Sequence, residues 1–176
     1  SPKPAGGFLV ATTDRILEYG TDGRLIRRLP GGPAVSAAAI IDGDLVLGFK
    51  DGIVEVMDGD RNWGAKGIQF EGAPGKRVMT IVEGPPGTMV AGFADGTVML
   101  WDFSSGKSLA AIRLHGPVLH LEMHGAGLYA ATEVGDVFSW DLGDFFLSYQ
   151  DILNEVRQEI PVIWDAGQVV TAEPSD

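Results

Sequence analysis

The segment Gly92-Phe93-Ala94-Asp95-Gly96-Thr97-Val98-Met99-Leu100-Trp101-Asp102 predicts a β-hairpin. Apolar residues lead into Phe93, and Gly96 supplies the backbone freedom that a tight reversal between two strands requires. The residues from Thr97 to Trp101 are β-branched, apolar or aromatic, a composition that fits a pleated and buried surface. We therefore expect two antiparallel strands here, joined by a turn at Asp95 and Gly96.

Weaker copies of this pattern occur three more times in the chain. Gly52 and Gly135 hold the turn position in two copies, and Asp14 holds it in the first. A large residue follows five positions after each turn, and these residues are Tyr19, Met57, Trp101 and Trp140. The turn positions 14, 52, 96 and 135 are 38, 44 and 39 residues apart. A period of roughly 40–45 residues with a Trp-Asp signature is typical of a four-stranded propeller blade.

On these residues the chain resembles the WD-repeat β-propeller family, most clearly over residues 88–142. The segments around Val35 and Val118, each preceded by proline, resemble the entry into the innermost strand of a blade. Blades of this family often carry a Gly-His pair whose His bonds to the turn Asp and the Trp. Here the order is reversed, as His115-Gly116, and Val134 stands where the fourth turn Asp belongs. The resemblance implies an all-β fold, a partial or small propeller of about four blades without the family's usual polar network.

Composition limits the classes of function. The chain of 176 residues is 45% hydrophobic, with 25 Gly and 10 Pro, which suits one domain of many short strands and turns. It lacks cysteine, which excludes disulfides and thiolate metal sites, and no run of 18 apolar residues predicts a membrane span. We expect a cytoplasmic protein. The net charge of −11 disfavours a nucleic-acid surface and favours solubility or a basic partner.

The expected organisation has three parts. Residues 1–7 form a linker or frayed terminus, residues 8–143 the propeller segment, and residues 144–176 a helix, a hairpin cap and a tail. Asp144 is a good N-cap residue, and apolar residues then recur at intervals of four, three and four at Phe145, Tyr149, Ile152 and Val156. This pattern predicts an amphipathic helix of about four turns, and residues 162–171 predict a last hairpin.

The predicted strands number fourteen, divided among four blades, with incomplete blades at both ends. A terminal blade lacks a neighbour on one side, and repeat proteins do not leave such a face bare. Three arrangements are open: a small irregular ring, two chains that meet as half-rings, or an arc capped by the C-terminal helix and hairpin.

Candidate binding residues are Trp63, Phe145, Tyr149, Ile152 and Trp164. Trp63 lies in a polar loop and is either a flap over a blade or a recognition anchor, since tryptophan is enriched at interface hot spots. The helix stripe docks on its own domain or on a partner. The residues that define the repeat itself are Tyr19, Gly52, Met57, Asp95, Gly96, Trp101, Gly135 and Trp140.

One cluster has the chemistry of a metal site. Strand alternation places His120, Glu122 and His124 on one face with Val118, and places Leu119, Leu121 and Met123 on the other. Two imidazoles and a carboxylate suit Zn²⁺. Alternate side chains on one strand are about 6.6–6.8 Å apart, however, too far for three of them to chelate one ion. We expect no metal and no cofactor, and assign these residues to a solvated axis or to packing between blades.

No catalytic constellation is present in the sequence: it has neither a Gly-x-Ser-x-Gly motif nor a phosphate-binding loop followed by Lys and Ser or Thr. The resemblance implies a non-enzymatic scaffold for protein–protein interaction. Its partner would be another protein, with a basic surface, or a second copy, and neither nucleic acid nor a membrane.

Two alternatives remain open. The repeats followed by a helix and by Pro161-Val162-Ile163-Trp164-Asp165 are similar to the C-terminal propeller regions of bacterial signalling kinases, which implies a regulatory or sensor segment. A propeller hydrolase or lyase would use carboxylates, or His120 and His124, at the axis.

Overall fold

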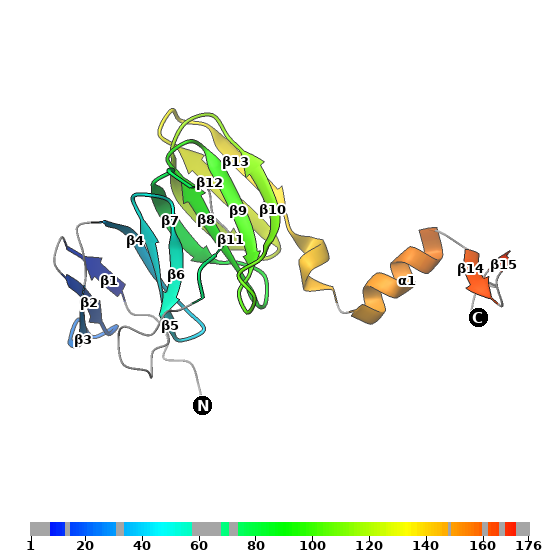
Figure 1. The fold of residues 1–176 in the computed structure, drawn as a ribbon, viewed down its shortest axis with the longest axis horizontal. Coiled ribbons are helices and arrows are strands. Elements are labelled where there is room, and N and C mark those ends of the chain that lie inside the picture. Colours follow the sequence, from blue (N-terminus) through cyan, green and yellow to red (C-terminus); the bar gives the residue numbers. More distant parts are fainter. Residues whose placement is uncertain are drawn as a thin grey trace. The chain divides into compact units, whose positions relative to one another are not determined.

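The computed structural model describes residues 8–12, 15–30, 34–57, 68–70, 74–147, 149–159, 162–165 and 168–171. The chain divides into two compact units, Ser1–Asp141 and Leu142–Asp176. The first unit is built from antiparallel sheets, each formed by strands consecutive in sequence (Figure 1). The predicted all-β, antiparallel character is confirmed.

The described residues of the first unit form four sheets. Sheet 1 consists of β1 (Phe8–Ala11), β2 (Arg15–Tyr19) and β3 (Leu25–Pro30). Sheet 2 consists of β4 (Val35–Ile41), β5 (Asp44–Phe49) and β6 (Val54–Met57). Sheet 3 consists of β7 (Val78–Glu83), β8 (Thr88–Phe93), β9 (Thr97–Asp102) and β10 (Ser108–Arg113). Sheet 4 consists of β11 (Val118–His124), β12 (Gly127–Thr132) and β13 (Val137–Asp141).

The predicted turn recurs with the same geometry in sheets 2, 3 and 4. Gly52, Gly96 and Gly135 have φ angles of 90°, 91° and 90°. Each donates its N–H to the carbonyl oxygen three residues earlier, at 3.2, 3.1 and 3.1 Å. Positive φ carries no steric penalty for glycine, which explains why these residues hold the turn.

Sheet 1 departs from this spacing. Thr12 N–H donates to the carbonyl of Arg15, three residues later. The N–H groups of Phe49 and Thr132 instead donate to carbonyls four residues later. The first hairpin is therefore one residue shorter than the others. Residues 13 and 14, which include the first predicted turn position, lie outside the described residues.

A β-bulge marks the start of the first strand in each of sheets 2, 3 and 4. The pairing register shifts between Val35 and Ala37, between Val78 and Thr80, and between Val118 and His120. A bulge inserts one extra residue and re-aims the side chains that precede it. The predicted strict alternation of β11 is therefore wrong at its start: Val118 and Leu121 are both buried, while Leu119 is 51% exposed.

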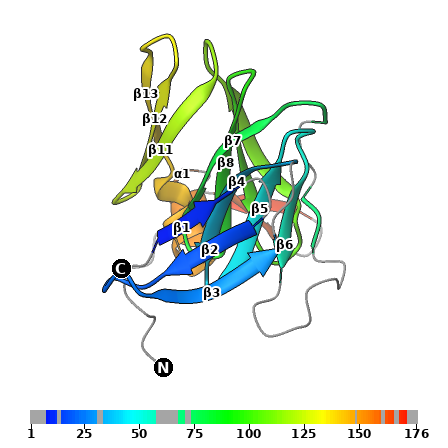
Figure 2. The same cartoon turned by 90° about the vertical axis from the view of Figure 1, so that its left-hand side faces the viewer.

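The bulged valines connect neighbouring sheets. A Cβ on Gly48 of β5 would lie 2.5 Å from Cγ1 of Val78, and a Cβ on Gly92 of β8 would lie 2.5 Å from Cγ1 of Val118. Each valine thus occupies the space over a glycine of the preceding sheet. β7 accordingly contacts both β4 and β11 (Figure 2).

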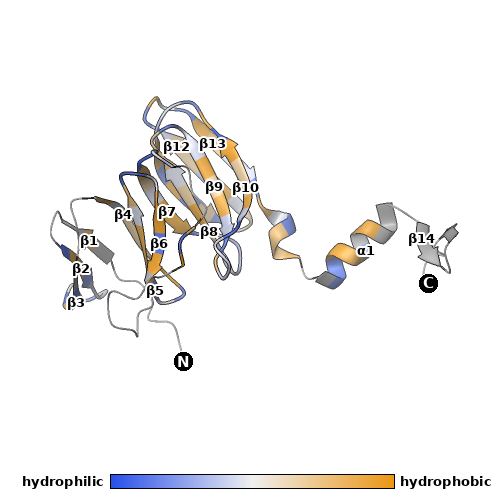
Figure 3. Cartoon of the chain, viewed as in Figure 1, coloured by the Kyte–Doolittle hydropathy of each residue, from blue (hydrophilic) through white to orange (hydrophobic). Residues whose placement is uncertain are grey.

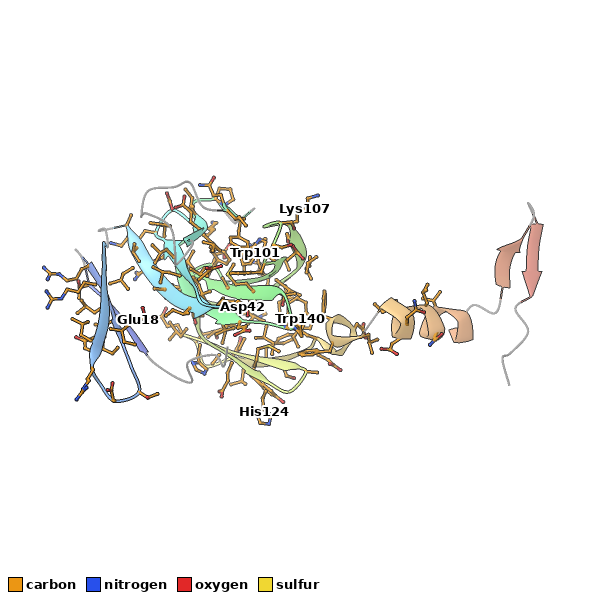
Figure 4. The ribbon with its side chains drawn as sticks, turned by 90° about the horizontal axis from the view of Figure 1, so that it is seen from below. Glu18, Asp42, Trp101, Lys107, His124 and Trp140 are labelled. Atoms are coloured by element: carbon orange, nitrogen blue, oxygen red, sulfur yellow. The ribbon has the colours of Figure 1, made fainter. Side chains whose placement is uncertain are left out.

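The largest core cluster joins sheets 2 and 3. Phe70 lies beside sheet 2, where its N–H donates to the carbonyl of Val54, and its neighbour Gln69 bridges to Glu55. The ring of Phe70 meets Trp101 edge-on at 5.8 Å, and Trp101 meets Phe93 at 6.1 Å. The fully buried Trp101 lies within this aromatic cluster (Figure 4).

The second unit contains a 3₁₀ helix η1 (Gly143–Phe146), the helix α1 (Tyr149–Glu159), and the hairpin of β14 (Val162–Asp165) and β15 (Gln168–Thr171). The predicted last hairpin is confirmed. The prediction of one continuous helix capped by Asp144 is wrong. Leu142 occupies the N-cap position of η1, and Leu147 is extended, with φ −71° and ψ 141°.

The break in the helix has a physical reason in the sequence. Phe145 and Phe146 are aromatic residues with modest helix propensity. Ser148 precedes Asp151 by three positions, the spacing of a second helix-start signal, and Asp151 lies in the first turn of α1. A new helix therefore begins here instead of the first one continuing.

Candidate interaction surfaces

The residues that define the repeat differ in burial according to their sheet. Trp101 of β9 is fully buried, whereas Trp140 of β13 and Tyr19 of β2 are half-buried. Both half-buried residues belong to the first or last sheet, while Trp101 belongs to a sheet with neighbours on both sides. Figure 4 labels both tryptophans. Met57 is the last residue of β6.

The carboxylate of Asp95 holds the turn of sheet 3. Burial pushes its pKa upward, but hydrogen bonds from Thr97 and the charges of Arg113 and Lys76 outweigh this and bring the pKa below its ordinary value. Asp95 Oδ1 accepts the N–H of Thr97 at 3.1 Å, and Oδ2 lies 3.6 Å from Nη1 of Arg113. This carboxylate is engaged in structure and is not positioned as a free acid or base.

Asp102, at the end of β9, organises the following loop. Its Oδ1 accepts hydrogen bonds at 2.7 Å from Ser104 Oγ, from the N–H of Ser105 and from Ser105 Oγ. These hydrogen bonds lower the pKa of Asp102. The two residues of the Trp-Asp signature in sheet 3 therefore have different roles: Trp101 packs in the core, and the carboxylate of Asp102 stabilises the loop that follows.

The structure does not gather His120, Glu122 and His124 into a metal site. They lie opposite Ala131, Tyr129 and Gly127 of β12, and all three are exposed. His120 Nε2 lies 3.5 Å from Glu122 Oε2, and the side chain of His124 projects into solvent (Figure 4). Within the described ranges, no three His, Asp or Glu side chains come together in a way that could hold a metal ion.

These polar residues give sheet 4 a solvated outer face. Ser139 of β13, which pairs with Tyr129, lies on the same face and is exposed. Tyr129 and Val137 lie on this face as well and are 44% and 78% exposed, so the face combines polar and apolar side chains.

The second unit exposes apolar side chains over a short length of chain. Among the side chains that the structure describes in η1, Leu147 and α1, the large apolar ones that are exposed are Phe145, Phe146, Leu147, Ile152 and Val156. The exposed fractions of Ile152 and Val156 are 42% and 47%. Figure 3 shows the alternation of apolar and polar residues along α1.

The other predicted binding residues belong to different elements or lie outside the described residues. Tyr149 is the first residue of α1, and Trp164 pairs with Val169 across the last hairpin. Trp63 lies outside the described residues. The sequence-based selection missed Val137 and Phe138 of β13, which are 78% and 39% exposed. The signal available for them was that the fourth copy of the repeat stops after its third strand.

No family model and no curated protein matches this chain. Among solved structures, the chain is similar to the crystal structure of the computationally designed Ika4 protein. The identity is 24% over 81% of this chain and 94% of that chain, with a TM-score of 0.59. The computationally designed Ika8 protein is similar at 23% identity over 76% of this chain and 44% of that one, with a TM-score of 0.58. These likenesses show a shared fold.

None of the helices in the described part of the chain is long and apolar enough to cross a membrane.

Proposed function

We propose that this chain is a non-enzymatic protein–protein interaction scaffold whose sheets are WD-like propeller blades. Sheets 2, 3 and 4 repeat one turn and one bulge, and the same valine-over-glycine contact joins successive sheets. Such repetition, together with the Trp-Asp signatures, supports the relationship to WD repeats. It supplies a rigid platform on which exposed segments can present a binding surface.

The observation that carries the proposal is the set of exposed apolar side chains of the second unit: Phe145, Phe146, Leu147, Ile152 and Val156. A helix of 11 residues is marginal by itself in water, and packing of its apolar face normally stabilises it. Contiguous exposed apolar surface is typical of protein-binding sites. The net charge of −11 favours a partner with a basic rim around an apolar centre.

The test compares a double substitution in α1 with a single substitution in β3. Both introduce Asp at exposed apolar positions. We call the exposed apolar residues Ile152 and Val156 the α1 stripe. Ile152→Asp combined with Val156→Asp places charges in this stripe, whereas Ile26→Asp changes a residue of β3 that is 61% exposed. Immobilised wild-type protein and both variants are used to capture partners, with native mass and circular dichroism recorded for each. We expect the α1 variant to lose the partners that the wild type and the Ile26 variant retain. Retention by all three would refute the proposed surface, and loss of sheet signal would assign α1 to the fold.

A further inference from the structure

The outer edge of β13 differs from the equivalent edge in sheet 3. β9 is paired on one side with β8 and on the other with β10. β13 holds the equivalent place in sheet 4 and pairs with β12, but no described strand lies on its other side. Sheet 3 therefore shows what a fourth strand in this position looks like.

The backbone of β13 is oriented for such a strand. In sheet 3, Asp102 N–H donates to the carbonyl of Lys107 at 3.0 Å, and Leu114 N–H donates to the carbonyl of Gly96 at 2.8 Å. In sheet 4, the carbonyl of Asp136 accepts from Thr132, so Asp136 faces β12. Alternate residues of an antiparallel strand direct both backbone groups to the same side. Val137 and Ser139 therefore direct theirs to the open edge.

The side chains along this edge are apolar in the middle and acidic at the ends. Val137 and Phe138 are exposed, and Asp136 and Asp141 flank them. The segment from Val137 to Asp141 contains neither Lys nor Pro, the residues that commonly protect an edge strand from pairing. An edge of this kind is suited to strand addition, in which backbone hydrogen bonds supply affinity and side chains supply specificity.

The charge at one end of the edge selects the chemistry of the added strand. In sheet 3, Arg113 of β10 pairs with Thr97, and its guanidinium reaches the turn carboxylate of Asp95. The position equivalent to Thr97 in sheet 4 is Asp136, whose Oδ2 lies 3.7 Å from Nδ1 of the exposed His115. A basic residue in the Arg113 position would lie directly opposite Asp136. Opposite charges that face each other across strands are stabilising.

We infer that β13 binds an extended segment of a partner protein as a fourth strand, with small apolar residues followed by a Lys or Arg opposite Asp136. This inference rests on the proposed interaction function and names a second surface for it. Pairing of two β13 edges would instead bring Asp136 and Asp141 of both copies onto one ribbon, between chains of net charge −11. The acidic ends therefore favour a basic segment over a second copy.

The first experiment uses a labelled peptide with the sequence of residues 106–114, Gly-Lys-Ser-Leu-Ala-Ala-Ile-Arg-Leu, as the probe. Its binding to the full chain is measured by fluorescence anisotropy, with a scrambled peptide as the control for non-specific charge attraction. Ser139→Pro removes an outward N–H, and proline is tolerated at the solvent side of an edge strand. We expect Ser139→Pro to weaken binding roughly tenfold, the effect of one lost hydrogen bond, and Ser139→Ala to leave it unchanged.

A charge exchange keeps the test decisive even where Ser139→Pro unfolds sheet 4. Asp136→Lys should weaken binding of the original peptide and strengthen binding of a peptide with Glu in place of its Arg. Equal affinities in all four combinations, or equal binding of the scrambled peptide, would overturn the inference.

Two further outcomes separate this inference from the proposed function. The variant with Asp at positions 152 and 156 should bind the peptide as the wild type does, because β13 is unchanged. Capture of partners through α1 without any peptide binding would overturn the β13 inference alone. A native mass that rises with concentration in the wild type but not in Ser139→Pro would assign the edge to a second copy, which also overturns it.

Discussion

Gly96 is constrained by its backbone conformation and by its surroundings. A Cβ at this position would overlap the carbonyl oxygen of Leu114 and lie 2.9 Å from that of Gly116. Gly135 has the same positive φ, but a Cβ there would meet nothing within 4 Å. We predict that Gly135→Ala lowers the free energy of unfolding by about 1 kcal/mol, the cost of the left-handed conformation. Gly96→Ala should cost about 3 kcal/mol or more, because backbone atoms must also move.

Urea unfolding of Gly96→Ala and Gly135→Ala, each compared with the wild type, measures how much unfolding free energy each substitution costs. Equal losses of stability would show that the close approach of Leu114 is relieved without cost. A larger loss for Gly135→Ala would contradict the steric argument altogether.

The turn carboxylate of Asp95 should make stability depend on pH. Its pKa in the folded state is lowered, so its stabilising contribution is full above the unfolded-state pKa of about 3.9 and is lost as the pH falls through the folded-state value. We predict that the wild type loses more unfolding free energy than Asp95→Asn between pH 5 and pH 3. Urea titrations at several pH values provide the measurement, and parallel pH profiles would contradict the prediction.

The junction of sheets 2 and 3 depends on Phe70, a residue outside the regular strands. Its side chain is buried and contacts the rings of Trp101 and Phe103. Phe70→Ala should lower the free energy of unfolding by about 3–5 kcal/mol, because it leaves a cavity in the core. Phe138→Ala, at an exposed position of β13, serves as the matched control and should cost much less. Similar losses in the two variants would show that Phe70 does not join the sheets.

The elements that the sequence predicts well are those that local residues determine. The hairpin turn depends on Gly96 and Asp95, and it is present in the structure because both features act over a few residues. The bulge at Val118 is not apparent from the sequence, since it depends on space over Gly92 in another sheet. The break at Leu147 was missed because the apolar period of the helix continues through it.

The candidate surfaces also differ in whether local residues are enough to predict them. The apolar residues Ile152 and Val156 are identifiable from the helical period, and both are exposed on α1. The edge of β13 is not identifiable from its own residues, because Val137 and Phe138 resemble any strand. Its signal in the sequence is that the fourth repeat stops after its third strand, and among the described strands β13 pairs with β12 alone.

At the scale of the whole molecule, sheets 1 and 4 both carry apolar side chains that a second copy could contact. Tyr129 and Val137 are exposed on the face of sheet 4 that also carries His120. Sheet 1 pairs Leu17 with Val10 on the face opposite Ile16. Ile16 itself is buried against Leu45 and Leu47 of sheet 2. A net charge of −11 on each chain opposes self-association.

We therefore predict that the native mass in solution, measured by light scattering, is that of one chain and does not change with concentration in the micromolar range. A monomer directs the search for partners to the α1 stripe and the β13 edge, since neither would be covered by a second copy. A mass of two chains would contradict the prediction. Leu17→Asp would then locate the contact: dissociation would assign it to sheet 1, because charge in an apolar interface is strongly destabilising, and persistence would assign it to another surface.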